Sequence, residues 1–152
     1  MNAGPVLALV TRALARRRLD AVLIGNAAAA LQGAPMTTLD FDCMFRKTPR
    51  NLQKLRGLAG DLGAVVLRPY DRVSDLYRVM RDLNTLQLDF MTRVDGVPSF
   101  EALRARATAA AFGGAELRVA TLEDVIRGKA AAARPRDRAV LPVLRAALRE
   151  SR

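Results

Sequence analysis

Two aspartates stand at alternate positions of an apolar run, and this pattern limits what the segment can form. In "TLDFDCMF", residues 38–45, Asp40 and Asp42 flank Phe41. Side chains alternate across a β-strand, so both carboxylates project from one face while Phe41 and Cys43 project into the core. Two carboxylates a few Å apart raise each other's pKa unless a cation lies between them. We therefore predict a strand with a cation site on one face, although an Asp-x-Asp pair can also lie solvated at a strand end.

A third acid occurs in a second alternating segment. In "TLQLDFM", residues 85–91, Asp89 lies on the face away from three apolar residues, Leu86, Leu88 and Phe90. If the two strands are neighbours, Asp89 converges with Asp40 and Asp42 on one metal site. Mg²⁺ takes oxygen ligands and keeps waters for substrate phosphates. Two-metal phosphoryl transfer requires such a set of carboxylates, so Mg²⁺ is the expected cofactor.

Residue types absent from the chain exclude other chemistry. Histidine is absent, which excludes Ser–His–Asp and Cys–His catalysis and the commonest transition-metal ligand. The single cysteine excludes an internal disulfide, and we interpret Cys43 as a core residue. No apolar run approaches the ~20 residues that span a bilayer, so no membrane association is expected, and the cytoplasm is the expected compartment.

The charge is strongly basic. There are 25 Lys plus Arg against 15 Asp plus Glu, a net charge of +10, which attracts polyanions and nucleic acid first. Aromatic residues are few, so any nucleic-acid contact would be mainly to phosphates. Two arginine groups are either such a surface or solvated faces, and Arg134 is alternatively a brace paired with Asp137. These groups are Arg16, Arg17 and Arg18, and Arg127, Arg134, Arg136 and Arg138.

Periodicity and capping residues indicate an α+β protein, with a mixed sheet flanked by helices in one domain over 1–152. Its core is expected at 20–92, and a helical C-terminal part at 99–150. Expected strands cover 20–25, 38–45, 64–68, 76–82, 85–91 and 115–120. Expected helices cover 5–17, 26–33, 48–63, 100–110, 122–133 and 137–150, and Thr48, Ser99 and Thr121 are expected N-caps.

The segment "LIGNAAAALQG", residues 23–33, suggests a phosphate site. It is a strand, then Gly25, then a short helix with Asn26 as the expected N-cap and Gly33 as its end. A helix N-terminus offers unpaired backbone N–H groups and the positive end of a dipole, which favour phosphate. This turn precedes the acidic pair by about fifteen residues, so it supplies the triphosphate half of a site whose metal half is the three aspartates.

This order of motifs resembles the nucleotidyltransferase superfamily, the fold of DNA polymerase β and the aminoglycoside nucleotidyltransferases. It is most similar to the small bacterial members of the abortive-infection and toxin–antitoxin type. Their pattern runs strand, Gly-Gly or Gly-Ser, helix, Gly, Arg-x-Thr-x-Asp-x-Asp and later a third acid. Here it reads "IGN", Gly33, "MTTLDFD" and "LDF". Two positions depart from the pattern, since Asn26 replaces Gly or Ser and Met36 replaces Arg.

The C-terminal part also resembles these proteins, where a lysine is followed by an Arg-Pro-x-Asp turn. The matching positions are Lys129, Arg134, Pro135 and Asp137, so the resemblance spans residues 21–140. It implies that Asp40 and Asp42 bind two metals, and that Asp89 binds the catalytic metal and helps to deprotonate the attacking hydroxyl. It further implies that the β and γ phosphates are held by Gly25 and Asn26, and that developing charge is neutralised by Lys129. A solvated helix lysine is the alternative interpretation of Lys129.

The resemblance implies an enzyme that transfers a nucleoside monophosphate from an NTP to an acceptor hydroxyl with Mg²⁺, releasing pyrophosphate. The acceptor would be RNA, such as tRNA, or a protein, and a toxin paired with an antitoxin is one such role. A second hypothesis is non-enzymatic: the same fold serves as a basic module that binds RNA or a partner protein. Metal-dependent NTP binding distinguishes the two.

Overall fold

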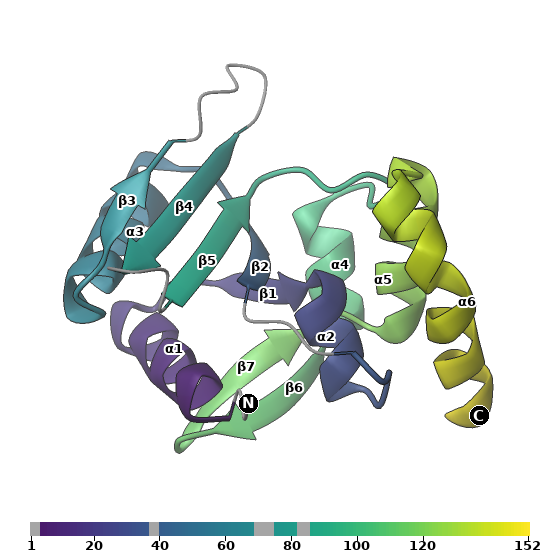
Figure 1. The fold of residues 1–152 in the computed structure, drawn as a ribbon. Coiled ribbons are helices and arrows are strands. Elements are labelled where there is room, and N and C mark those ends of the chain that lie inside the picture. The colour runs from purple at the N-terminus through teal and green to yellow at the C-terminus, as the bar shows by residue number, and fades with distance from the viewer. Residues whose placement is uncertain (1–3, 37–39, 69–74, 82–85) are drawn as a thin grey trace.

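The computed structural model describes residues 4–36, 40–68, 75–81 and 86–152, which form one mixed sheet flanked by helices (Figure 1). The strands are β1 Ala21–Ile24, β2 Asp40–Phe45, β3 Val65–Leu67, β4 Leu76–Arg81, β5 Leu86–Met91, β6 Thr108–Phe112 and β7 Ala115–Val119. The helices are α1 Gly4–Arg17, α2 Gly25–Leu31, α3 Pro49–Asp61, α4 Phe100–Arg106, α5 Leu122–Ala132 and α6 Pro135–Glu150. The α+β class and the mixed sheet expected from the sequence are confirmed.

The strand order brings the two acidic segments together. The sheet runs β3-β4-β5-β2-β1-β7-β6. The central strand β2 is antiparallel to β1 and parallel to β5, and β1 is parallel to β7. Antiparallel pairs complete both ends, β3 and β4 with β5 on one side and β6 with β7 on the other. The acidic strand β2 therefore lies beside the second acidic strand, β5.

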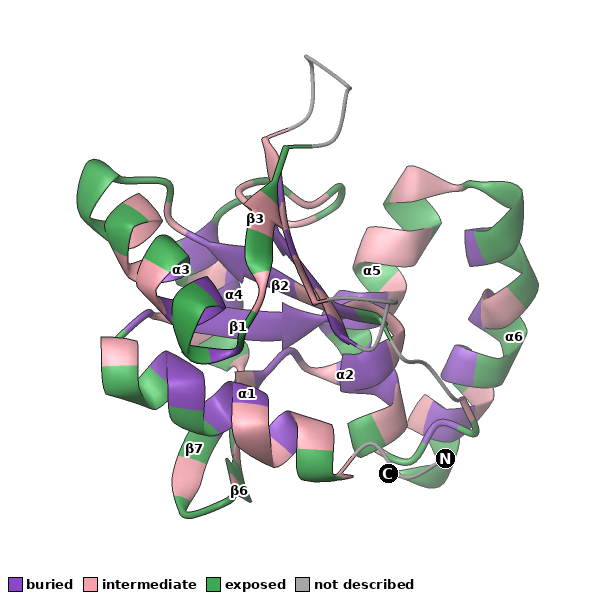
Figure 2. Ribbon diagram, turned by 60° about the vertical axis from the view of Figure 1, so that its left-hand side comes forward, coloured by how far each residue is buried: buried purple, intermediate pink, exposed green. Residues whose placement is uncertain are grey.

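The apolar residues that alternate with the acids form the core. Phe45 of β2 packs edge-to-face on Phe90 of β5, with ring centroids 5.6 Å apart, and on Tyr77 of β4 at 6.0 Å. Cys43 is buried, as expected of a core residue. Helices α1 and α3 pack against each other, with α1 also on β6 and β7 and α3 on β3. Figure 2 shows the buried central strands between the helices, and each large side chain buried there stabilises the fold by about 1.5–3 kcal/mol.

The sequence prediction of one helix over 100–110 is wrong at its C-terminal end. Helix α4 ends at Arg106, and Thr108–Phe112 forms a strand that pairs with β7. The hairpin turns at Gly113 and Gly114, which have φ of 59° and 82°. The alanines of this strand favour a helix, but propensity is a weak preference that pairing with a neighbouring strand overrides.

Buried carboxylates fasten the C-terminal helices. Asp124 of α5 is 3% exposed and accepts hydrogen bonds from Arg106 at the end of α4 and from Arg127. Asp137 of α6 is 1% exposed and accepts bonds from the backbone and side chain of Arg134. The expected caps Thr48, Ser99 and Thr121 also form. No described helix combines the length and apolar composition that a bilayer crossing requires.

Candidate active site

The turn between β1 and α2 lies directly against Asp42. Gly25 has φ of +67°, and a Cβ at this position would lie 3.2 Å from Asp42 Oδ2. The register of β1 with β2 explains the contact, because Ile24, one residue before the glycine, is the partner of Asp42. Glycine is therefore favoured both by the left-handed backbone and by the space that the carboxylate occupies.

Helix α2 begins one residue earlier than expected. Its N-cap is Ile24, which provides no side-chain hydrogen bond, so the interpretation of Asn26 as the N-cap is wrong. Because Asn26 lies inside the first turn, its side chain is badly placed to accept from the N–H groups that a cap satisfies. Its Oδ1 is buried and has no hydrogen-bond partner among the described residues, and a hydrogen-bond donor on a ligand would relieve the cost of that burial.

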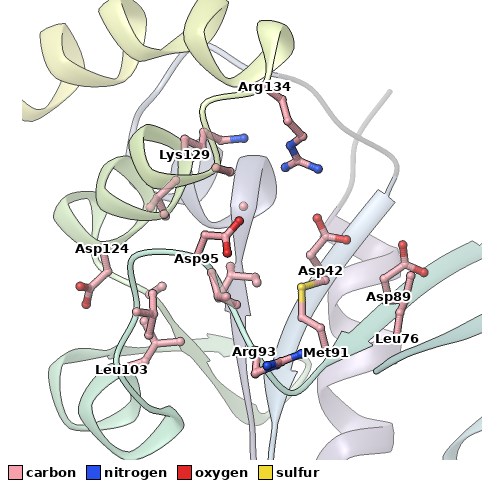
Figure 3. A pocket seen from close by; sticks show the side chains of 18 of the residues that line it. Asp42, Leu76, Asp89, Met91, Arg93, Asp95, Leu103, Asp124, Lys129 and Arg134 are labelled. Carbon is pink, nitrogen blue, oxygen red and sulfur yellow. The ribbon is translucent and has the colours of Figure 1, made fainter. Parts of the chain in front are cut away.

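The acids of β2 and β5 stand side by side. In the parallel register Asp42 is the partner of Asp89, and Asp40 is the partner of Gln87. Figure 3 shows the carboxylates of Asp42 and Asp89 directed to the same side of the sheet. The neighbouring strands and the shared face expected from the alternation are therefore present, while the roles assigned to these residues stay predictions.

Burial is the main cause that raises the pKa of Asp42 to about 6, and the charges of Asp89 and Asp40 raise it further. The positive charges of Lys129 and Arg134 oppose the shift. Because the ionised form of Asp42 is disfavoured in this way, a bound cation would stabilise it more than it would stabilise an exposed carboxylate.

Asp89 is already paired with a cation. Arg78 of β4 donates from Nε to Asp89 Oδ1 at 2.8 Å and from Nη2 to Oδ2 at 3.2 Å, and Gln87 donates to Oδ2 at 3.3 Å. Within the described ranges, no group of three or more acidic or cysteine side chains is arranged to hold a metal. The neighbouring oxygens of Asp42 and Asp89 do fit a hard cation, but those of Asp89 are shared with Arg78.

Lys129 and Arg134 face Asp42 from the C-terminal helices (Figure 3). The Lys129 side chain is 14% exposed, so it is not a solvated helix lysine. Burial is the largest cause that lowers its pKa; Asp137, whose Oδ1 lies 3.7 Å from Nζ, opposes that shift. Arg134 pairs with Asp137 at 2.6 Å as expected, but this pair caps the start of α6, and the link between α5 and α6 is made by Lys129 with Asp137. Both cations therefore border the cavity while anchored to one buried carboxylate.

The site opens into a cavity of about 570 Å³. A second cavity of about 580 Å³ adjoins it, and both are bordered by the segment 91–97. Sequence reasoning missed Arg78, Arg93 and Asp95, which line the first cavity. Arg78 stands opposite Asp89 only through the β4–β5 register, which the sequence alone does not fix. No sequence signal marks Arg93 and Asp95, because they lie in the irregular segment after β5.

Several solved structures share the fold of this chain at low sequence identity. ANT(2″)-Ia in complex with adenylyl-2″-tobramycin gives a TM-score of 0.65 at 16% identity, covering 97% of this chain and 90% of that one. The lincosamide antibiotic adenylyltransferase LnuA, lincomycin-bound, gives 0.60 at 11% identity over 93% and 92%. An antigenic nucleotidyltransferase-like protein from Paracoccidioides brasiliensis gives 0.60 at 17% over 93% and 74%. The chain has the nucleotidyltransferase fold.

The likeness is one of structure. No protein-family model matches the sequence, and no curated protein matches it. The motif resemblance is thus confirmed at the level of the nucleotidyltransferase fold, and the toxin–antitoxin type stays a prediction.

We expect Gly25→Ala to destabilise this nucleotidyltransferase fold more than Gly63→Ala. Both glycines have similar φ, +67° and +64°, so both alanines incur backbone strain of about 1–2 kcal/mol. A Cβ at Gly63 meets nothing within 4 Å, whereas at Gly25 it meets Asp42 Oδ2 at 3.2 Å. Chemical denaturation of the two variants measures the difference. Equal losses of stability would show that the contact with Asp42 is unimportant.

Asp42→Asn should stabilise the fold near neutral pH. The folded-state pKa of about 6 lies above the usual 3.8, so the folded chain binds the proton more tightly than the unfolded chain. The stability from this proton is present below about pH 4 and is lost as the pH rises past about 6, a loss of about 3 kcal/mol. Unfolding without divalent cations should therefore favour the variant near pH 7 and show little difference near pH 4. A difference that does not vary with pH would contradict this expectation.

Proposed function

We propose that this chain is a Mg²⁺-dependent nucleotidyltransferase that moves a nucleoside monophosphate from an NTP to an acceptor hydroxyl. The contact between Gly25 and Asp42 carries the proposal, since a turn suited to phosphate touches a carboxylate that has another carboxylate beside it. Phosphate and two carboxylates repel each other unless a cation lies between them, so the juxtaposition favours a metal–triphosphate ligand. The adenylyltransferase activity of LnuA, which shares the fold, agrees with this chemistry.

The transfer requires little covalent chemistry from the protein. The acceptor oxygen would form a bond to the α-phosphorus, the bond from the α-phosphorus to the bridging oxygen would break, and pyrophosphate would leave. Asp89 would accept the proton of the acceptor hydroxyl. Asp40, Asp42 and Asp89 would hold Mg²⁺, which when bound supplies positive charge to the phosphate oxygens.

The turn between β1 and α2, beside Asp42, would hold the leaving group. Gly25 and Asn26 begin α2, and backbone N–H groups there would bind the β and γ phosphates. Lys129 would neutralise the charge that develops on pyrophosphate, and its position facing Asp42 suits that role. The unpaired Asn26 Oδ1 would accept a hydrogen bond from a hydroxyl or water of the ligand.

The cavity favours an anionic acceptor, and RNA is the acceptor we propose. Arg93 and Arg136 line the cavity, and neither has an ion pair among the described residues. Of the four lining carboxylates, Asp124 is neutralised by two arginines and Asp89 by Arg78, and Asp42 would be neutralised by the bound Mg²⁺. A polycationic acceptor would meet repulsion here, whereas RNA phosphates would find free arginines. Modification of an RNA needed for translation, such as tRNA, would make the chain a toxin that requires an antitoxin.

The non-enzymatic hypothesis has an observation in its favour as well. Arg78 engages both oxygens of Asp89, and Asn26 and Met36 stand where the family pattern has other residues. A basic module that binds RNA or a protein without transferring a nucleotide would keep the fold and lose the metal response. Nucleotide binding in the presence of Mg²⁺ therefore tests the proposed function.

Mg²⁺ with an NTP should raise the melting temperature, because a ligand that binds only the folded state stabilises it. When the ligand concentration is a hundred times its dissociation constant, the free energy of unfolding rises by about 2.7 kcal/mol. Asp40→Asn and Asp42→Asn should abolish the shift at nearly constant shape. Asp95→Asn, which removes a carboxylate from the same cavity outside the acidic strands, is the control and should retain it. Shifts that survive in both β2 variants would mean that the nucleotide binds elsewhere.

Arg136→Ala with Arg93→Ala should weaken RNA binding and flatten its salt dependence. The logarithm of the RNA association constant falls as the logarithm of the salt concentration rises, and each lost phosphate contact should make this slope less steep by about one. Arg138→Ala is the matched control, because this exposed arginine lies two residues along α6 and outside the cavity lining. Filter binding at several salt concentrations measures the slopes. An unchanged slope in the double variant would mean that RNA binds another part of the surface, for instance Arg16 and Arg18. If the chain binds a protein but no RNA, a protein acceptor would be favoured.

A further inference from the structure

Asp89 lies between a carboxylate and a guanidinium in one row across the sheet. β5 pairs with β2 so that Asp42 stands on one side of Asp89, and β4 pairs with β5 so that Arg78 stands on the other. Residues paired in this way project from the same face. Asp42, Asp89 and Arg78 all line the same cavity, so any cation that reaches Asp89 also approaches Arg78.

Arg78 occupies both oxygens of Asp89. Its two hydrogen bonds, 2.8 Å and 3.2 Å long, form a bidentate pair, the strong type of charge-assisted bond. The Asp89 side chain is 11% exposed and that of Arg78 is 32% exposed, so water screens the pair only in part. Asp89 thus has its counter-charge within the chain.

Asp42 has no comparable partner. In the described part of the chain its carboxylate receives no hydrogen bond, and no cationic side chain lies within ion-pair distance of it. The two neighbouring acids are therefore unequal, since one is exposed to a ligand from the cavity and the other is neutralised.

We propose that Arg78 is an internal counter-ion that competes with a divalent cation for Asp89. The inference rests on the proposed function, because it concerns the same acidic site. The lone pairs that accept from the guanidinium are those that a metal would use, and two positive charges a few Å apart repel strongly in a partly buried site. A cation is held first at Asp42 and engages Asp89 only when Arg78 withdraws. Arg78 is thereby a positioning residue that sets the metal affinity of the site.

The test is a Mn²⁺ titration of the nucleotide-free chain, with free Mn²⁺ measured by electron paramagnetic resonance. Arg78→Gln should tighten Mn²⁺ binding by about tenfold, a change equivalent to about 1.4 kcal/mol. Adding Asp89→Asn to that variant should remove the gain. Arg93→Gln is the matched control, because Arg93 lines the same cavity and has no ion pair among the described residues. It should change the affinity by less than about twofold, since Arg93 makes no ion pair with Asp89 and is not among the charges that shift the pKa of Asp42.

Equal affinity of Arg78→Gln and the unsubstituted chain would overturn this inference and leave the proposed transfer chemistry standing. If Arg93→Gln tightened Mn²⁺ binding as much as Arg78→Gln, the inference would also be overturned, because the loss of any positive charge from the cavity would then explain the change. If no variant binds Mn²⁺ and Mg²⁺ with an NTP gives no thermal shift, the proposed function fails as well. Should Arg78→Gln melt too early to titrate, Arg78→Lys keeps the charge but not the bidentate geometry. If Arg78→Lys tightens Mn²⁺ binding by less than the tenfold expected of Arg78→Gln, the inference is supported. If Arg78→Lys leaves the Mn²⁺ affinity unchanged, the inference is overturned.

Discussion

The parallel pairing of β2 with β5 is the constraint on which the rest of the site depends. Its register sets Asp42 beside Asp89 and leaves the apolar residues that alternate with these acids, including Phe45 and Phe90, on the opposite face. A slip of one residue would put every acid of a strand into the core, so the buried aromatic contacts hold the carboxylates in place. Burial is the main cause that raises the pKa of Asp42, and repulsion from the neighbouring carboxylates raises it further; a bound cation would relieve that repulsion. The core thus supplies the stability that keeps an unfavourable pair of charges on the cavity face.

The basic composition is divided between two uses. Several arginines are internal fasteners: Arg17 pairs with Asp61 between α1 and α3, Arg127 and Arg106 hold Asp124, and Arg134 pairs with Asp137. Of these, Arg17, Arg127 and Arg134 come from the two arginine groups that the sequence offered as a binding surface. The net charge of +10 is therefore not all available to a polyanion, and the cavity-lining arginines outside these pairs are better candidates for contact with an acceptor.

Local patterns predicted much of the fold. Alternation identified β2 and β5 and the face of each residue, and the cap residues located the starts of α3, α4 and α5. Prediction failed where a distant segment decides the outcome. Thr108–Phe112 is a strand because β7 lies beside it, and α2 begins at Gly25 without an Asn26 cap because the strand before it leads directly into the turn at Asp42. Neither interaction is encoded in the neighbouring residues.

The sequence by itself determined that Asp40 and Asp42 share a face, that a glycine turn precedes them, and that neither histidine chemistry nor an internal disulfide is available. These follow from the period of two along a strand and from composition, which need no knowledge of neighbours. Only the tertiary structure decided that Asp89 is paired with Arg78, that Lys129 faces Asp42 from a C-terminal helix, and that Arg93 lines the cavity. Such contacts depend on strand order, register and helix packing, which join residues far apart in the chain and so leave no local signal.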